Sequence, residues 1–410
     1  MLLNRIWIGM FLIAMIVAIS KLVFWQDTDI FRQLVDALFA AADTGFTLSL
    51  SLTGVLCFWM GVMKIGENGG AIGHLTKLVS PLFSRLFPEV PKDHPANGAM
   101  MMNFSANMLG LDNSATPLGL KAMKELQTLN PDKGRASNAQ IMFLVLNTSG
   151  LTLIPVSIFA LRAESTSPTT VFLPILITTF ISSLFGLVFV SIRQKINLFN
   201  RIILAYLGGI SLLIGGLLYY IIYNPDKTNL ISNVAGNFII FLVIILFMIL
   251  AWRKKINVYE SFIEGAKEGF GVAVSIIPYL VAMLAAIAVF RASGTLDVIT
   301  DGIKEAALFC GITVLHWVDA LPVAFMKPLS GGGARGAFVE VMDNFGIDSM
   351  QEKIAATMQG STETTFYVLA VYFGSVNIKN TRYAAGAGLL CDLVGIIAAI
   401  IISYLFYTNG

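Results

Sequence analysis

Charged residues are scarce for a chain of this length. Only 13% of the 410 residues are Asp, Glu, Lys or Arg, whereas 56% are hydrophobic and the mean hydropathy is +0.77. A soluble protein of this size needs far more charge to cover its surface. The sequence therefore predicts an integral membrane protein whose excess apolar surface faces lipid.

Cysteine and histidine are also scarce, and neither is arranged for metal binding. The cysteines form no CxxC pair and lie in apolar surroundings, and the histidines show no HExxH spacing. The sequence also lacks a Walker pattern and a nucleophile–base set. We therefore expect no disulfide framework, no metal centre, no cofactor other than a coupling ion, no nucleic-acid partner and no enzyme activity. The residues concerned are Cys57, Cys310, Cys391, His74, His94 and His316.

Nine windows of the sequence have the roughly 20 apolar residues that a membrane-spanning helix needs. The first ends at Trp25, an interfacial anchor, and it lacks a small-x-small cleavage site, so we interpret it as a span rather than a cleaved export signal. The fold class expected is an all-α, polytopic membrane protein. The windows are 6–25, 46–65, 138–161, 169–192, 199–222, 231–252, 270–291, 352–374 and 382–407.

The basic residues predict the orientation of these spans. Arg and Lys gather in alternate loops, most densely at Arg253, Lys254 and Lys255, whereas the turn at Asn224–Thr228 is poor in them. Because basic loops stay in the cytoplasm, we expect a protein of the bacterial inner membrane with a cytoplasmic N-terminus and an external C-terminus. This holds only if the stretches near 96–127 and 318–345 enter the membrane and return on the same side. Gly, Pro and Asn break both stretches, so we expect two re-entrant hairpins.

The same order of features occurs twice along the chain. An apolar helix is followed by an amphipathic stretch, a broken hairpin, a helix interrupted by polar residues and a final apolar span. The interruptions lie at Asn147–Gly150 and Gly360–Thr365. The predicted orientation turns the two halves upside down, which gives an inverted repeat with discontinuous helices, as in many secondary transporters. The alternative is that two polytopic segments look alike because both are apolar.

Three motifs carry a resemblance to a known family. They are Asn113–Met123 (NSATPLGLKAM), Met326–Ala334 (MKPLSGGGA) and Thr357–Tyr367 (TMQGSTETTFY). Through the first, residues 40 to 192 resemble spore maturation protein A, and through the others, residues 230 to 407 resemble spore maturation protein B. The chain thus looks like a fusion, with an A-like half at 1–198, a linker span at 199–230 and a B-like half at 231–410.

The family carries the nucleoside-recognition, or gate, domain, which is also found in concentrative nucleoside transporters and in the membrane part of ferrous iron transporters. The resemblance implies membrane transport or gating, with one gate domain in each half. Two residues depart from the pattern expected of the family, since Gly332 replaces a serine and Asp112 replaces a glycine. Either departure changes what a hairpin tip contacts.

Breaking a helix within lipid frees backbone groups, so broken segments occur where they line a cavity or lie within protein. Half-helix N-termini attract carboxylates or phosphates, and C-terminal carbonyls attract cations. We therefore predict a solute-binding site where the hairpin tips and the interrupted helices meet. For any one hydroxyl, the alternative is a hydrogen bond to its own helix. The predicted residues are Asn113, Ser114, Thr116, Asn147, Thr148, Ser149, Ser330, Gly331, Gly332, Gln359, Ser361, Thr362, Glu363 and Thr364.

Glu363 is the strongest single candidate, because a carboxylate in the middle of an apolar helix is costly and by default functional. Binding of Na⁺, transfer of a proton and direct contact with the solute are all open to it, and the alternative is a structural ion pair with a base such as Arg335. Asp112, at a hairpin tip within reach of water, is the second ion-coupling candidate. Weaker candidates, for which solvated or interfacial positions serve equally well, are Asp319, Asp392 and Lys327.

These features predict a secondary transporter of a small polar solute, either nucleoside-like or a small organic anion. It would work by alternating access and be driven by Na⁺ or H⁺. The alternative is a non-transporting membrane scaffold or a gating component of a larger complex. Convergence of polar side chains from both halves on one cavity would favour the transporter, and scattered tips would favour the scaffold. The expected partners are the solute and the lipid bilayer, and a homo-oligomer is compatible with the sequence.

Overall fold

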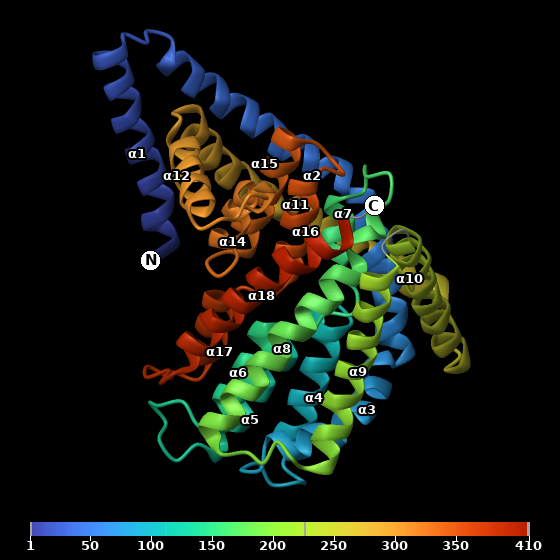
Figure 1. Ribbon diagram of the computed structural model, residues 1–410. Coiled ribbons are helices and arrows are strands. Elements are labelled where there is room, and N and C mark those ends of the chain that lie inside the picture. The colour runs from blue at the N-terminus through green and yellow to red at the C-terminus, as the bar shows by residue number, and fades with distance from the viewer. Residues whose placement is uncertain (1, 111, 225–226, 408–410) are drawn as a thin grey trace.

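The chain folds into α-helices joined by short connections (Figure 1). The computed structural model describes residues 2–110, 112–224 and 227–407, although some side chains within these ranges are not described. Across these ranges there is one short 3₁₀ helix and no named strand. The prediction of an all-α fold is therefore confirmed for the described part of the chain.

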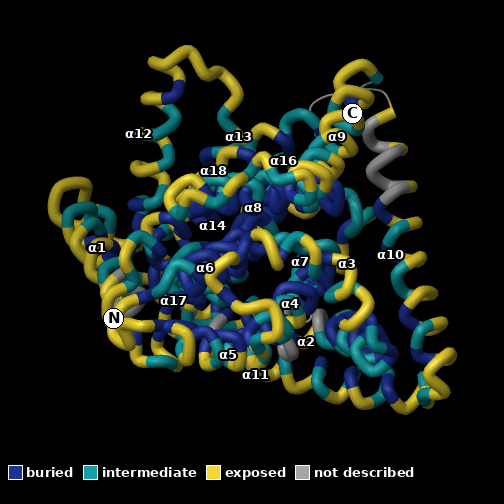
Figure 2. Tube along the Cα trace, turned by 90° about the horizontal axis from the view of Figure 1, so that it is seen from below, coloured by how far each residue is buried: buried dark blue, intermediate teal, exposed yellow. Residues whose placement is uncertain are grey.

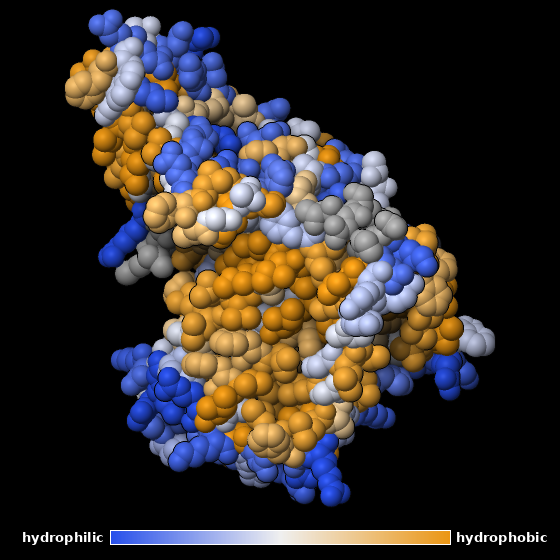
Figure 3. All heavy atoms as spheres, viewed as in Figure 1, coloured by the Kyte–Doolittle hydropathy of each residue, from blue (hydrophilic) through white to orange (hydrophobic). Residues whose placement is uncertain are grey.

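Five of the described helices are long and apolar enough to cross a membrane: α1 (Leu2–Trp25), α8 (Phe172–Gln194), α9 (Arg201–Tyr223), α10 (Thr228–Arg253) and α18 (Ala384–Tyr407). Only 6% of the most apolar window of α9 is buried, and α1 and α10 are also exposed along much of their length (Figure 2). Figure 3 shows a broad hydrophobic face between two hydrophilic ends. Because apolar helices with so much exposed surface require lipid, the chain is a membrane protein.

The other four predicted windows are not plain spans. Windows 46–65 and 270–291 lie within α2 (Ile30–Gly69) and α11 (Val258–Ala292), which are longer and carry charges at their ends. Window 138–161 is divided into α6 (Asn138–Ser149) and α7 (Val156–Leu161), and window 352–374 into α16 (Met350–Gly360) and α17 (Thr365–Ser375). A bent pair, the second half of α11 with α12 (Thr295–Phe309) at 70°, adds one more candidate span to the five. The count of nine spans stays a prediction.

Both broken stretches fold as helical hairpins. The first consists of α4 (Pro95–Met108) and α5 (Asp112–Leu129), and the second of α13 (His316–Asp319), α14 (Leu321–Met326) and α15 (Gly331–Phe345). The amphipathic stretch that follows the first of the two repeated apolar helices folds as α3 (Ala71–Leu86), which buries one face. It contacts the first hairpin through Phe83 and Phe104, whose ring centroids lie 5.1 Å apart. This contact holds α4 from the side.

The sequence sets the ends of the interrupted helices locally. Ser137 and Gln140 form a capping box at the start of α6. Gly150 ends α6 with a φ of 50°, in the left-handed region that favours glycine. Ser349 caps α16 by accepting from the amide of Glu352 at 3.1 Å.

The long helices α2 and α11 run antiparallel and pack along most of their length. The Ser49 hydroxyl donates to the Ala273 carbonyl at 2.6 Å, and further along α2 the Asn68 amide donates to the Ser261 hydroxyl at 3.1 Å. Glycines allow this close approach, since a Cβ added to Gly265 would lie 2.3 Å from the Met60 carbonyl oxygen. The pair also packs against the second hairpin, since a Cβ added to Gly336 of that hairpin would lie 3.0 Å from Cβ of Met283 in α11.

The two interrupted helices also run antiparallel. Before α6, the Ala136 amide donates to the Asn380 carbonyl, which follows α17, at 2.9 Å. After α7, the buried Arg162 reaches Glu352 at the start of α16 at 2.6 Å. The breaks of the two interrupted helices therefore lie next to each other, between these two contacts.

Candidate functional site

The two helix breaks are joined by a backbone hydrogen bond. The Glu363 amide donates to the Thr148 carbonyl at 2.8 Å. Beside this bond, a Cβ added to Gly150 would lie 3.0 Å from Cγ of Glu363, so glycine lets the Glu363 side chain approach. Each break thus satisfies part of the backbone polarity that the other exposes.

The hairpins meet the same breaks. At the first hairpin, the Leu153 amide donates to the Met108 carbonyl at 2.7 Å, and a Cβ on Gly110, whose φ is 70°, would lie 2.5 Å from the Ile154 carbonyl oxygen. At the second, the Phe366 amide donates to the Pro328 carbonyl at 2.9 Å. Both hairpins and both interrupted helices therefore converge on one region.

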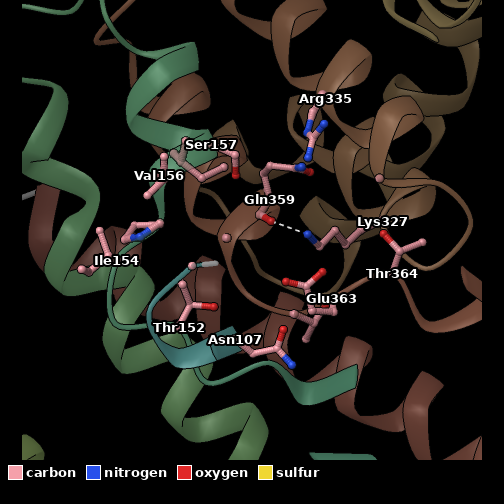
Figure 4. Close-up of a pocket in the computed structure, with 16 residues that line it drawn as sticks. Asn107, Thr152, Ile154, Val156, Ser157, Lys327, Arg335, Gln359, Glu363 and Thr364 are labelled. Carbon is pink, nitrogen blue, oxygen red and sulfur yellow. Dashed lines mark hydrogen bonds between the residues drawn. The ribbon is translucent and has the colours of Figure 1, made fainter. Parts of the chain in front are cut away.

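This region contains a cavity of about 70 Å³ (Figure 4). Such a volume is large enough to hold water. Its walls come from α4, the break after α6, α7, the second hairpin and the break after α16. The lining residues are Asn107, Gly110, Thr152, Ile154, Pro155, Val156, Ser157, Ile158, Lys327, Gly331, Arg335, Gln359, Gly360, Thr362, Glu363 and Thr364.

The cavity brings two basic side chains and one carboxylate together. Lys327 is 6% exposed, and its Nζ donates to the Gln359 carbonyl at 2.6 Å. Among the described residues, Nε of Arg335 and Oε1 of the buried Gln359 are buried atoms without a hydrogen-bond partner. Figure 4 shows the side chains of Lys327, Glu363 and Arg335 around this space. Such unpaired polar atoms are costly in the interior and mark a place for a ligand or water.

The first residues of α15 add amide groups to this charge. Ser330 caps the helix by accepting from the Gly333 amide at 3.0 Å, and Gly331 lines the cavity. A helix N-terminus carries partial positive charge. The described cavity wall therefore has an excess of positive charge on the side of the second hairpin.

Amide side chains hold the first hairpin against α6. Asn107 donates to Oδ1 of Asn147 at 2.8 Å, and Asn103 donates to the Ala115 carbonyl at 2.7 Å and to the Tyr372 hydroxyl at 3.2 Å. These bonds cross between α4, α5, α6 and α17. They fix the distance between the hairpin and the interrupted helices.

A buried ion pair holds α7 and α16 together at one end. Arg162 and Glu352 are both fully buried and form a bidentate pair, with Nε to Oε1 at 2.6 Å and Nη2 to Oε2 at 3.2 Å. Arg162 also reaches Asp348 at 3.0 Å. Burial alone would raise the pKa of Asp348, but hydrogen bonds from Ser165 and Thr166 and the Arg162 charge lower this pKa below its usual value.

Comparison with known proteins identifies the family. The Gate family, which is described as "Nucleoside recognition", matches residues 49–164 and 273–379, and these together make up more than half of the chain. The chain belongs to the Gate family. The two matched stretches contain both helix breaks and every residue that lines the cavity.

Two Bacillus subtilis (strain 168) proteins are similar to different parts of this Gate family chain. It is 48% identical to spore maturation protein B over 157 residues, which are 38% of this chain and 86% of that protein. It is 38% identical to spore maturation protein A over 183 residues, which are 44% of this chain and 90% of that protein. The resemblance to both proteins is confirmed.

The predicted site residues of this Gate chain separate into several groups. Gly331, Gln359, Thr362, Glu363 and Thr364 line the cavity. Others make hydrogen bonds beside the cavity. Asn147 accepts from Asn107, the Thr148 carbonyl accepts from the Glu363 amide, and Ser330 caps α15. Ser149 and Ser361 donate to carbonyls of their own helices at 3.4 and 2.7 Å. Thr116 and Gly332 are partly exposed and do not line the cavity. The side chains of Asp112, Asn113 and Ser114 lie outside the described residues.

Several lining residues of the Gate cavity were not among the predicted site residues. Asn107 precedes Gly110 in the first hairpin, Thr152 lies in the break after α6, and Ser157 lies in the first turn of α7. Lys327 ranked as a weak candidate and Arg335 only as a partner for Glu363. The sequence did contain a signal for Arg335, because this base follows the glycines 331–333 at the predicted tip of the second hairpin by only two residues.

Proposed function

We propose that this Gate family member is a secondary transporter of a small polar solute. The observation that carries the proposal is the cavity at the helix breaks, which polar and charged side chains from both matched stretches line. Pockets between discontinuous helices are the usual position of solute sites in secondary transporters. A scaffold has no need to direct Asn107, Lys327, Arg335 and Glu363 to one point, so their convergence favours transport over the scaffold alternative.

The proposed mechanism is alternating access between the two halves of an inverted repeat. The antiparallel pairings of α2 with α11 and of the two interrupted helices support the inversion. In this mechanism the hairpins move relative to the interrupted helices and expose the cavity to each side in turn. The orientation that we propose keeps the N-terminus in the cytoplasm and the C-terminus outside the bacterial inner membrane, because the basic loops favour it.

Within the solute classes expected, we propose a small organic anion rather than a neutral nucleoside. Arg335 has a buried Nε without a described partner, and Lys327 and the N-terminus of α15 lie on the same wall. Together these groups can hold a carboxylate or phosphate through charge-assisted hydrogen bonds. Oε1 of Gln359 is left to accept a hydrogen bond from a donor on the solute.

We propose that the transport is coupled to H⁺ or Na⁺ through Glu363. Its carboxylate lies in the cavity wall, close to the bases that would hold the solute. Binding of an anionic solute next to a carboxylate is easier when that carboxylate is neutralised, either by a proton or by a cation. This linkage would make ion binding and solute binding favour each other.

The test is a thermal-shift screen of purified protein against small carboxylates, phosphates and neutral nucleosides, followed by uptake into proteoliposomes. We expect anionic solutes to stabilise the protein and to be taken up along an ion gradient. Arg335→Gln should weaken the stabilisation about tenfold or more in concentration, because it removes a charge-assisted contact. Arg85→Gln, at an exposed position in α3, is the matched control. Stabilisation by nucleosides alone would overturn the solute class, and absence of uptake for every stabilising solute would favour the scaffold.

A further inference from the structure

A second buried polar cluster lies between the break after α16 and helix α18. Its centre is Asp392, which is 2% exposed in the middle of an apolar span. Oδ2 of Asp392 accepts from the fully buried hydroxyl of Thr365 at 2.6 Å. Asp392 does not line the cavity described above, although the cluster shares Thr362 with the cavity wall.

The sequence of α18 builds a recess around this carboxylate. Gly388, Asp392 and Gly395 follow one another at helical spacing and so share one face. A Cβ on Gly388 would lie 2.7 Å from Cγ2 of Thr365, and one on Gly395 would lie 2.8 Å from Cγ2 of Thr362. The two glycines therefore let the broken segment approach α18 closely, one turn to either side of the acid.

The cluster contains oxygen atoms that have too few partners. Oδ1 of Asp392 and the hydroxyl oxygens of Thr362 and Thr148 are buried and have no hydrogen-bond partner among the described residues. The Thr362 hydroxyl lies near the carboxylate, but without hydrogen-bond geometry. Thr148 touches the same face of α18, since its Cγ2 would lie 3.2 Å from a Cβ on Gly388. A carboxylate inside a membrane with an unsatisfied oxygen needs a cation or a proton to neutralise it.

The surroundings of Asp392 favour a monovalent cation over a proton. Thr148 of α6 adds a hydroxyl beside this face of α18, whereas the Ser182 hydroxyl of α8 is engaged with the Cys391 carbonyl. Lys327, whose Nζ donates to the Gln359 carbonyl, is the basic residue whose charge acts on Asp392. A proton on Asp392 would engage one oxygen, whereas a bound cation engages several together. A divalent ion would leave net positive charge beside one carboxylate, and the described residues contain no group of three His, Cys, Asp or Glu to hold one.

We propose that the carboxylate of Asp392, with the hydroxyls of Thr362 and Thr365, binds a Na⁺ ion. Oxygen ligands of this kind suit a small hard cation. The segment that carries both hydroxyls also carries Glu363 and Thr364 of the cavity wall, so the bound ion would order that wall from behind. This site goes beyond the proposed function, because Na⁺ binding here does not require that the protein transports anything.

The experiment is thermal unfolding of the purified full-length protein during a Na⁺ titration, at constant ionic strength with choline as the replacement ion and without added solute. A ligand that binds only the folded state raises Tm in a saturable way. We expect such a rise with Na⁺, a loss of it in Asp392→Asn, and an increase of about tenfold or more in the Na⁺ concentration needed by Thr365→Val, the size typical of a lost metal-site contact. Ser403→Ala, which removes a buried hydroxyl elsewhere on α18, should keep the wild-type response.

Three outcomes would overturn the site. They are no effect of Na⁺ on the wild-type protein, an unchanged Na⁺ response in Asp392→Asn, and a Tm that responds to pH but not to Na⁺, which would identify a proton site. If Asp392→Asn does not fold, binding of radioactive Na⁺ to wild type and Thr365→Val decides the question, because equal binding by both contradicts the proposal. A Na⁺ response lost in Glu363→Gln alone would transfer the ion to the cavity and leave the proposed function intact.

Discussion

The backbone amide of Glu363 donates a hydrogen bond of 2.8 Å to the carbonyl oxygen of Thr148. The two residues are far apart in the sequence, and each lies where its helix is interrupted. Backbone groups freed by such interruptions must find partners away from lipid. Here each break supplies the partner for the other, and the Glu363 side chain remains in the wall of the cavity.

The first prediction tests the junction of the two breaks. Gly150→Ala should destabilise the protein by about 1–2 kcal/mol, because the left-handed backbone disfavours a side chain and the new Cβ would lie 3.0 Å from Cγ of Glu363. Thermal unfolding in detergent measures the loss. Gly208→Ala in α9 is the control, since its added Cβ meets nothing within 4 Å. Equal Tm values for the two variants would show that the junction tolerates a side chain.

The second prediction concerns the buried pair between α7 and α16. Glu352→Gln leaves the fully buried guanidinium of Arg162 without its bidentate partner, so we expect a loss of about 3–5 kcal/mol. Glu264→Gln is the control, because Glu264 is 59% exposed and pairs with Lys64 at a surface where about 0–1 kcal/mol is at stake. Chemical or thermal unfolding measures the stability that each of the two variants loses relative to wild type. A small effect of Glu352→Gln would mean that Asp348 alone can neutralise Arg162.

The third prediction is an acid sensitivity that comes from Asp348. Its pKa in the folded protein is lower than the usual 3.8, so its ionised form stabilises the fold. This stability is fully present above the usual pKa and is lost as the pH falls below it, through the lowered folded-state pKa. The difference in Tm between wild type and Asp348→Asn should therefore shrink as the pH falls below about 4. A difference that stays constant down to pH 3 or so, by the same linkage, would contradict this origin.

Local signals were sufficient to predict much of the fold. The windows that became α1, α8, α9, α10 and α18 are uniformly apolar, and helices of that kind need no tertiary partner to be recognised. Both interruptions were also predicted close to their observed positions, because Gly150 and Gly360 each lie where a helix stops. The inverted arrangement of the halves stays a prediction, although the antiparallel pairings support it.

The remaining features depend on contacts between distant residues. Arg162 was not singled out, because only its approach to Glu352, far along the chain, distinguishes it from an ordinary loop arginine. Arg335 became part of the cavity because the second hairpin folds back on the break after α16. Asp392 ranked low because its sequence neighbours do not reveal that Gly388 and Gly395 let the segment after α16 pack closely against α18. Sequence alone does not encode such approaches in a form that periodicity can detect.

The fourth prediction concerns Glu363 as the coupling residue. With an anionic solute identified by the screen, Glu363→Gln should still bind the solute but should no longer respond to the coupling-ion or pH gradient, because the neutral amide mimics the neutralised carboxylate. Uptake into proteoliposomes with and without the gradient measures this. Thr152→Val, which removes another polar group from the same cavity, is the control and should keep the gradient dependence. An ion dependence that survives in Glu363→Gln would exclude Glu363 from coupling.

The last prediction tests the inverted arrangement through the membrane orientation of one turn. The turn after α9 should face the outside, because it lies between spans and away from the Arg253–Lys255 cluster. Asn224→Cys should therefore react with an impermeant thiol reagent added to intact cells, after Cys310, which is exposed, is replaced by Ser. Lys254→Cys is the matched variant and should react only after the membrane is opened. If the two variants exchange these patterns, the proposed orientation is reversed. If both react from the same side, α10 does not cross the membrane and the linker span no longer supports an inversion of the halves.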